Sequence, residues 1–261
     1  MNLLSEIVSS KQRRVDHAKQ LVPLAQMRAM ANQARLGSRL HAFASALANA
    51  DKINIIAEFK RRSPSKGEIR RDADPVITAR AYESAGASAV SVLTEEDYFG
   101  GSLDDLRAVR NAISLPILRK DFVFDEYQVY ESAAAGADAV LLIVAALDDE
   151  ALGRLHRITE DELGMDALVE VHTADEMTRA AACGARIIGV NNRDLQTFKV
   201  SLETSVQLAS IASTGSVLIS ESGIASAGDI RRLRSVGYRA FLIGESLMRA
   251  DDPGELLRSF L

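Results

Sequence analysis

The chain has 261 residues, of which 47% are hydrophobic and 26% are charged, a composition typical of globular proteins. Its formal net charge of −5 gives no electrostatic basis for binding nucleic acid. Its sequence has no stretch that approaches the roughly 18 consecutive apolar residues of a membrane-spanning helix. We therefore expect neither nucleic acid nor a membrane as a partner.

The number of cysteines and the N-terminal residues indicate the cellular compartment of the protein. Cys183 is the only cysteine, so an internal disulfide is excluded and a reducing compartment fits best. Charge arrives early, at Glu6, and no long apolar core follows, unlike a signal peptide. These features predict a cytoplasmic protein. No cluster has the spacing of metal ligands and no Walker loop is present, so neither metal nor cofactor is expected.

The first 50 residues predict one or two amphipathic helices. Leu3, Leu4 and Ile7 form an early apolar set, Phe43 and Leu47 belong to a later one, and a proline interrupts the stretch. The sequence leaves open whether this extension covers the bottom or the top of the domain that follows.

Short apolar runs then alternate with amphipathic helical segments. The predicted strands cover residues 55–59, 89–93, 116–118, 139–143, 167–171, 187–190, 217–220 and 240–243. They show little polar alternation, as expected for parallel strands buried on both faces. Glycines such as Gly86 and Gly136 precede several strands, where a left-handed residue ends a helix. Asp74 with Pro75, and Ser226 with Asp229, predict helix starts.

Eight such units in about 210 residues predict an α/β fold, a closed (β/α)8 TIM barrel. We expect one domain, with the barrel over 53–261 and residues 1–50 as an N-terminal helical extension. The alternative is an open doubly wound sheet, which the lack of a G-x-G-x-x-G motif after the first strand disfavours.

The ends of the predicted strands bear ionisable and amide side chains. Glu58 and Lys60 are two residues apart at the end of the first strand, so their side chains should point the same way. Lys120, Glu170 and Asn191 lie at the ends of the third, fifth and sixth strands. One such residue alone is more often a solvated loop position. Their convergence from separate strands favours a catalytic site at the barrel mouth. For Lys120, apolar surroundings and nearby cations predict a pKa lowered towards neutral pH.

Glycine-containing turns follow the last two strands. Ser222 and Gly223 come after the seventh strand, and Gly244 and Glu245 after the eighth. Barrels commonly bind phosphate at this position, where glycine lets backbone N–H groups approach the anion. Each glycine alone is more often an ordinary turn residue, but the two together predict a phosphate site.

Two further features lie at strand ends. The basic loop 60–67 is either a solvated loop or a mobile lid that brings cations to a substrate anion, and its place after the first strand favours the lid. His172 is the only histidine at a strand end, and we expect it to be peripheral.

At these positions the chain resembles the indole-3-glycerol phosphate synthase family, a barrel of tryptophan biosynthesis. The most specific segments are 56–67 (IAEFKRRSPSKG) and 116–122 (PILRKDF). Further matching segments are 92–102, 168–172, 188–195, 220–224 and 241–248. The resemblance therefore runs in order through nearly the whole chain. It implies conversion of 1-(2-carboxyphenylamino)-1-deoxyribulose 5-phosphate to indole-3-glycerol phosphate, carbon dioxide and water, without a cofactor.

The resemblance implies catalytic roles for five residues. Lys120 would be the general acid that protonates the ketone during ring closure, and Glu170 would take part in the later dehydration. Glu58 would be a supporting carboxylate, and Asn191 would place the reacting groups. Lys60 would bind an anion near the phosphate.

The resemblance also implies a substrate-binding set. Ser63 and Arg193 would handle the anthranilate carboxylate, and Phe122 and Leu142 would wall the aromatic ring. The phosphate cradle would consist of Ser222, Gly223, Gly244 and Glu245, mainly through their backbone. Some family members carry serine at the last of these positions, so the Glu245 carboxylate should turn away from the phosphate. A monomer or weak homo-oligomer, able to contact other tryptophan-pathway enzymes, is also implied.

The sequence also allows two rival functions. The chain could be another phosphate-handling barrel, either a ketose isomerase or an aldolase in which Lys120 forms a Schiff base. It could also be a barrel without enzymatic activity that binds a ligand or acts as a scaffold.

Overall fold

The chain forms a closed barrel of eight parallel strands, seen in a computed structural model that describes residues 3–195 and 197–261. The strands are β1 (Asn54–Phe59), β4 (Ala89–Leu93), β5 (Ile117–Lys120), β6 (Ala139–Ile143), β7 (Asp166–Val171), β8 (Ile187–Asn191), β9 (Val217–Glu221) and β10 (Ala240–Ile243). They neighbour one another in chain order, and β10 pairs with β1 to close the sheet. The predicted TIM barrel is confirmed, and the open sheet is excluded.

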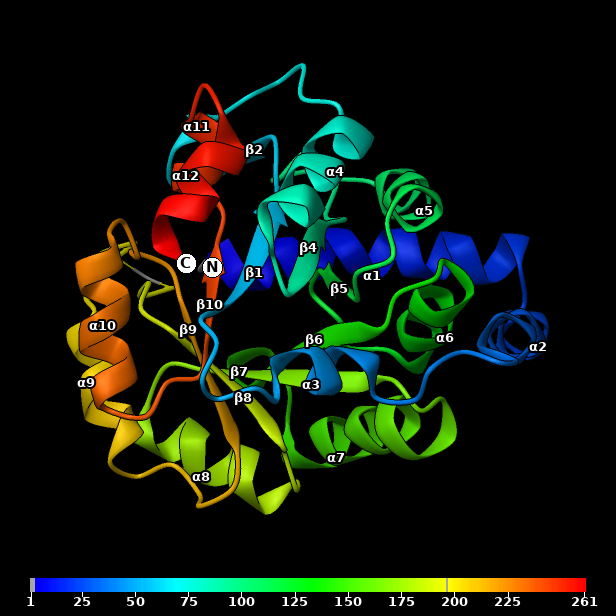
Figure 1. Cartoon of the computed structure of the whole chain (residues 1–261). Coiled ribbons are helices and arrows are strands. Elements are labelled where there is room, and N and C mark those ends of the chain that lie inside the picture. Colours follow the sequence, from blue (N-terminus) through cyan, green and yellow to red (C-terminus); the bar gives the residue numbers. More distant parts are fainter. Residues whose placement is uncertain (1–2, 196) are drawn as a thin grey trace.

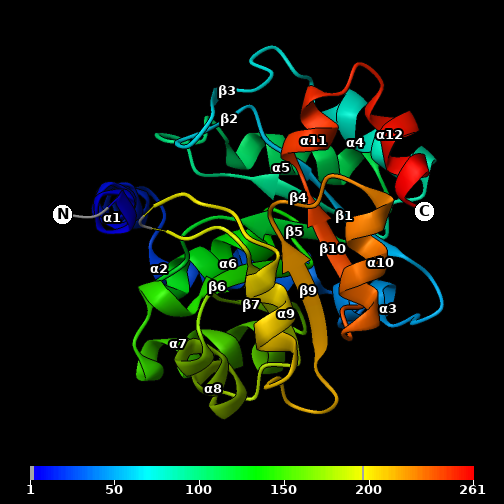
Figure 2. The same ribbon diagram turned by 90° about the vertical axis from the view of Figure 1, so that its left-hand side faces the viewer.

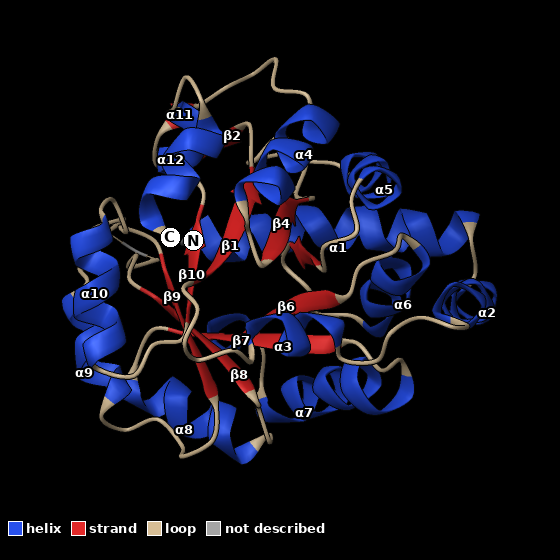
Figure 3. Cartoon of the chain, viewed as in Figure 1, coloured by secondary structure: helices blue, strands red, loops and turns tan. Residues whose placement is uncertain are grey.

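Helices surround the strands (Figure 3). They are α4 (Pro75–Ala85), α5 (Leu103–Ala112), α6 (Glu126–Ala134), α7 (Asp149–Arg157), α8 (Ala174–Ala182), α9 (Glu203–Ala209), α10 (Ala227–Ser235) and α12 (Pro253–Phe260), with the short α11 (Glu245–Arg249), η1 (Val144–Ala146) and η2 (Ile158–Glu162). Two predicted helix starts are confirmed. The Asp74 carboxylate accepts hydrogen bonds from backbone N–H groups at the start of α4, and Ser226 forms a reciprocal capping box with Asp229 at α10.

The N-terminal extension contacts both ends of the barrel (Figures 1 and 2). Its first two residues lie outside the described part of the chain. Helix α1 (Leu3–Leu21) lies across the C-terminal ends of the strands, and α2 (Leu24–Arg35) packs beside α6. Helix α3 (Ala42–Leu47) closes the opposite end, where Phe43 and Leu47 pack against residues inside the barrel. In the described residues, no helix is long and apolar enough to cross a membrane.

Side chains alternate between the barrel interior and the helical layer. Ile56, Leu118 and Leu168 belong to the inner apolar cluster, whereas their strand neighbours Ala57, Ile117 and Val169 belong to the outer one. Because both faces are buried, the strands read as continuous apolar runs. Strands β5, β8 and β9 extend beyond their predicted ends, so the polar residues that end them are held by the sheet itself.

The loop 60–67 contains a feature that was not predicted. Strands β2 (Arg62–Ser63) and β3 (Gly67–Glu68) form a small antiparallel hairpin at its end. This hairpin gives the basic loop a defined course beside the mouth of the barrel.

Candidate active site

A cavity of about 790 Å3 opens at the C-terminal ends of the strands. This volume is within the range of small-molecule sites. It is lined by these predicted site residues: Glu58, Lys60, Ser63, Lys120, Phe122, Glu170, Asn191, Arg193, Ser222, Gly223, Gly244 and Glu245. The barrel therefore brings together residues that are distant in sequence.

The prediction for Leu142 was wrong. Its side chain is fully buried in the outer apolar cluster, between the sheet and the helices. Its neighbours Leu141 and Ile143 line the cavity instead. Successive residues of a strand point to opposite faces. A prediction that is shifted by one residue therefore selects a side chain on the wrong face of the sheet.

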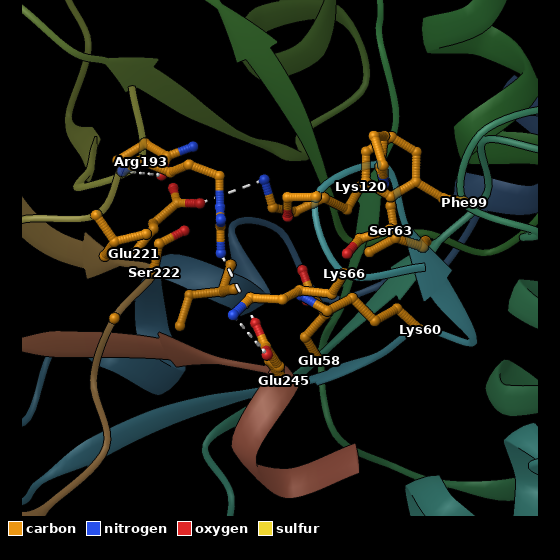
Figure 4. Close-up of a pocket in the computed structure, with 18 of the residues that line it drawn as sticks. Glu58, Lys60, Ser63, Lys66, Phe99, Lys120, Arg193, Glu221, Ser222 and Glu245 are labelled. Atoms are coloured by element: carbon orange, nitrogen blue, oxygen red, sulfur yellow. Dashed lines mark hydrogen bonds and ion pairs between the residues drawn. The ribbon is translucent and has the colours of Figure 1, made fainter. Parts of the chain in front are cut away.

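Lys120 lies between two buried carboxylates. Its Nζ is 3.0 Å from Glu170 Oε2 and 3.3 Å from Glu221 Oε2, and Figure 4 shows the second of these contacts. Both glutamate side chains are at most 3% exposed, and the lysine side chain is 14% exposed. The three residues come from β5, β7 and β9, so the cluster spans the interior of the barrel.

The pKa of Lys120 contradicts the prediction. Burial by itself would lower this pKa, but the carboxylates of Glu170, Glu221 and Glu58 outweigh burial and raise it above the usual value. The prediction failed because it counted cations near the lysine, whereas its nearest charged neighbours are carboxylates. The ammonium form is therefore the stable form at neutral pH.

Glu221 lies at the end of the seventh strand of the barrel, but no role in the site was predicted for it from the sequence. Burial raises its pKa from 4.5 to about 7, and the nearby carboxylate of Glu170 adds to the rise, while Lys120 opposes it. Gly189 makes room for this side chain, because a Cβ there would lie 2.1 Å from Glu221 Oε1. The glycine inside the β8 strand was the available sequence clue, since strand glycines often mark a close approach.

The carboxylate of Glu58 lies near Gly244, in one of the two turns predicted to bind phosphate. Its Oε1 lies 2.5 Å from Lys60 Nζ. At Gly244, a Cβ would lie 2.1 Å from the same oxygen, so glycine is required there for the carboxylate to occupy its place. Glu58 thus meets the turn that follows β10, and Lys60 lines the same cavity.

Asn191 connects two parts of the site. Its Oδ1 accepts a hydrogen bond from the backbone N–H of Arg193 at 3.0 Å. A side-chain hydrogen bond from Asn191 helps to lower the pKa of Glu170, although burial and Lys120 act more strongly on that group. The amide therefore orients the carboxylate that contacts the lysine.

Cations gather around the two turns predicted to bind phosphate. The Glu245 carboxylate lies 3.6 Å from Lys66, 3.7 Å from Arg193 and 3.4 Å from Arg249. Figure 4 shows Lys66 and Arg193 directed at it. The carboxylate thus lies at the wall of the cavity, paired with these cations. Ser222 and Gly223 have φ values of 68° and 81°, a backbone conformation that residues other than glycine seldom adopt.

The opposite part of the cavity is apolar. The rings of Phe122 and Phe99 lie 6.1 Å apart between centroids, and both line the cavity. Leu3, Leu4 and Ile7 of α1 also line it. Sequence reasoning did not assign Phe99 or the extension to the site, because neither lies on a strand end.

His172, predicted to be peripheral, does not line the cavity but lies beside a residue that does. Its side chain is only 10% exposed, and Nε2 lies 3.5 Å from Glu170 Oε1. The histidine therefore contacts a carboxylate of the central cluster.

The fold and the cavity define a TIM-barrel enzyme. The site joins a cation-rich end, an apolar end and a lysine held between buried carboxylates. This arrangement suits acid–base chemistry on a small anionic molecule that also contains an aromatic or apolar part.

Comparisons with known proteins identify the family. The family model described as indole-3-glycerol phosphate synthase matches residues 4–260. An indole-3-glycerol phosphate synthase of Carboxydothermus hydrogenoformans is 48% identical over 263 residues, covering 99% of each chain. One of Bacteroides thetaiotaomicron is 45% identical over 260 residues, covering 100% of this chain and 98% of the relative. The chain belongs to the indole-3-glycerol phosphate synthase family, as its sequence predicted.

Solved structures support the fold alone. A 3-hexulose-6-phosphate synthase of Salmonella typhimurium superposes with a TM-score of 0.65 at 13% identity, covering 80% of this chain and 96% of that one. Such low identity says nothing about substrate.

Proposed function

We propose that this cavity converts 1-(2-carboxyphenylamino)-1-deoxyribulose 5-phosphate to indole-3-glycerol phosphate, carbon dioxide and water, a step of tryptophan biosynthesis. Membership of the family supports the reaction. The observation that carries the assignment to this site is the position of Lys120 Nζ, 3.0 Å from Glu170 and 3.3 Å from Glu221 inside the cavity.

Ring closure places negative charge on the ketone oxygen of the substrate. A protonated lysine next to that oxygen stabilises the charge and donates the proton. The raised pKa of Lys120 keeps it protonated at neutral pH and so ready to act as the acid. Loss of carbon dioxide then restores the aromatic ring.

Dehydration follows, in which a hydroxyl leaves and a carbon loses a proton. We assign Glu170 to this step, with Glu58 as a supporting carboxylate and Asn191 as the group that orients Glu170. Glu221, with its pKa near 7, is placed to exchange a proton with Lys120 between steps. No metal is needed for this sequence of proton transfers.

Binding of the substrate uses the two ends of the cavity. The phosphate would contact the backbone of Ser222, Gly223, Gly244 and Glu245, with Lys60 as a nearby cation. Ser63 and Arg193 would bind the anthranilate carboxylate. Phe122, together with Phe99, would pack against the aromatic ring.

The setting of the reaction is also a proposal. We propose that the chain works in the cytoplasm, as one domain with residues 1–50 as an extension of the barrel 53–261. We propose a monomer or weak homo-oligomer that is free to contact other tryptophan-pathway enzymes.

The test is to incubate the purified chain with the carboxyphenylamino substrate. We expect indole fluorescence to rise together with release of carbon dioxide in equal amounts. Absence of both would refute the proposal. The rival Schiff-base aldolase needs a neutral lysine as nucleophile, which the raised pKa of Lys120 disfavours. Borohydride reduction in the presence of substrate should therefore leave no adduct on Lys120, and an adduct would favour the aldolase.

A further inference from the structure

His172 lies directly after β7, between a carboxylate of the active site and one of the helical layer. Its Nε2 is 3.5 Å from Glu170 Oε1, and its Nδ1 is 3.2 Å from Glu176 Oε2 on α8. The backbone N–H of His172 also donates a hydrogen bond to Glu176 Oε2 at 2.7 Å. The ring therefore links a fixed carboxylate on α8 to the side chain that contacts Lys120.

The chemistry of imidazole limits the charge state of this ring. A neutral imidazole has one N–H donor and one lone pair, whereas an imidazolium has two N–H donors. Because both ring nitrogens face carboxylate oxygens, a neutral ring would direct a lone pair at a negative charge. Nε2 forms no hydrogen bond within the described residues, but two carboxylates within 3.5 Å of the ring favour the imidazolium electrostatically.

We propose that His172 is a positioning residue which, as an imidazolium, keeps Glu170 ionised and directed at Lys120, so that the exchangeable proton of the carboxylate pair resides on Glu221. The inference deepens the proposed function and rests on it. It gives the two carboxylates on either side of the lysine different protonation states.

The charges around the ring agree with this assignment. The groups that face His172 are Glu176 from α8, Glu170 from β7 and Glu221 from β9, with Lys120 beyond Glu170. Burial lowers the pKa of His172, but these carboxylates outweigh burial and raise it. Burial raises the pKa of Glu170, yet Lys120 and then His172 outweigh burial and lower it.

Glu221 provides the contrast. Its Oε2 lies 3.3 Å from Lys120 Nζ, and its pKa is raised to about 7. The two carboxylates share the lysine, but only Glu170 has the His172 ring within 3.5 Å, in addition to a hydrogen bond from Asn191. A cation within about 4–6 Å lowers the pKa of a carboxyl group by about one unit or more.

The test is the pH dependence of turnover in His172→Gln. The amide keeps a hydrogen-bond donor but has no charge, so the acidic limb of the kcat profile, which reports the carboxylate pair, should move up by about one pH unit. At pH values on the acidic side of the profile, kcat of the variant should be roughly one tenth of the wild-type kcat at the same pH. A purely structural role would lower kcat by the same factor at every pH.

A matched control is His156→Gln. His156 lies 3.7 Å from the buried carboxylate of Glu160 on the helical layer and does not line the cavity. The same substitution there should leave the acidic limb where it is in wild type. Superimposed limbs for His172→Gln and wild type would overturn the proposal.

A second measurement does not depend on turnover. Nitrogen-15 NMR of the chain, which has four histidines, can identify His172 as the resonance lost in His172→Gln. We expect both of its ring nitrogens to be protonated at pH 7, because the neighbouring carboxylates raise the pKa of the ring. A neutral ring at pH 7 would overturn the proposal even in an active enzyme, and an inactive wild type would instead count against the proposed function.

Discussion

Replacing Glu221 with glutamine should make the stability of the chain depend less on pH. The Glu221 side chain is 2% exposed, and Oε1 has no hydrogen-bond partner within the residues that the structure describes. Its pKa is raised from 4.5 to about 7. Between these values the folded chain holds a proton that the unfolded chain has released, so the free energy of unfolding falls as pH rises.

The magnitude follows from the two pKa values. The contribution is fully present below pH 4.5 and is lost as pH rises through about 7. The whole difference corresponds to about 3 kcal/mol at most. Glutamine imitates the protonated carboxyl at every pH. We therefore expect the stability of Glu221→Gln, relative to wild type, to increase by about 1–3 kcal/mol between pH 5 and pH 8.

Equilibrium urea unfolding at both pH values measures this difference. Glu150→Gln, at an exposed position in the first turn of α7, is the matched control and should show the same stability difference at both pH values. A pH-independent difference for Glu221→Gln would refute the reasoning, because it would mean that the buried carboxyl ionises like one in water. We also expect kcat to fall, since a destabilising buried charge is typical of catalytic sites.

Three further changes test other parts of the site. In Gly244→Ala, the new Cβ would lie 2.1 Å from Glu58 Oε1 and displace that carboxylate, so kcat should fall by roughly 10- to 100-fold; unchanged kcat would show that the displacement is harmless. Glu245→Ser removes an anion from among three cations, so KM for the phosphorylated substrate should fall by roughly threefold at constant kcat; a higher KM would contradict this. Lys11→Met removes a buried cation 2.9 Å from Asp121, so urea unfolding should show a loss of about 3 kcal/mol. A loss below about 0.5 kcal/mol would mean that the pair behaves like an exposed one.

Much of the barrel was predictable because parallel strands buried on both faces give uninterrupted apolar runs. The predicted strands 89–93, 139–143 and 240–243 coincide with β4, β6 and β10. Inward and outward side chains alternate along a strand, and this alternation correctly predicted that Glu58 and Glu170 line the cavity. These features depend on local sequence alone.

What could not be predicted depends on distances across the barrel. The pKa of Lys120 is governed by Glu170 and Glu221, which are 50 and about 100 residues away in the chain. The role of α1 in the wall of the cavity depends in the same way on how the extension folds back. His172 is a local case, because its partners Glu170 and Glu176 lie two and four residues away in the chain, but the direction of the ring between them does not follow from the sequence.

The most direct test of the account is the turnover number of Lys120→Met, which keeps an unbranched side chain but removes the ammonium group. We predict that kcat falls by at least about 100-fold, with the circular dichroism spectrum of wild type retained. A folded Lys120→Met variant that forms indole-3-glycerol phosphate at nearly the wild-type rate would contradict the claim that this lysine is the acid of the reaction.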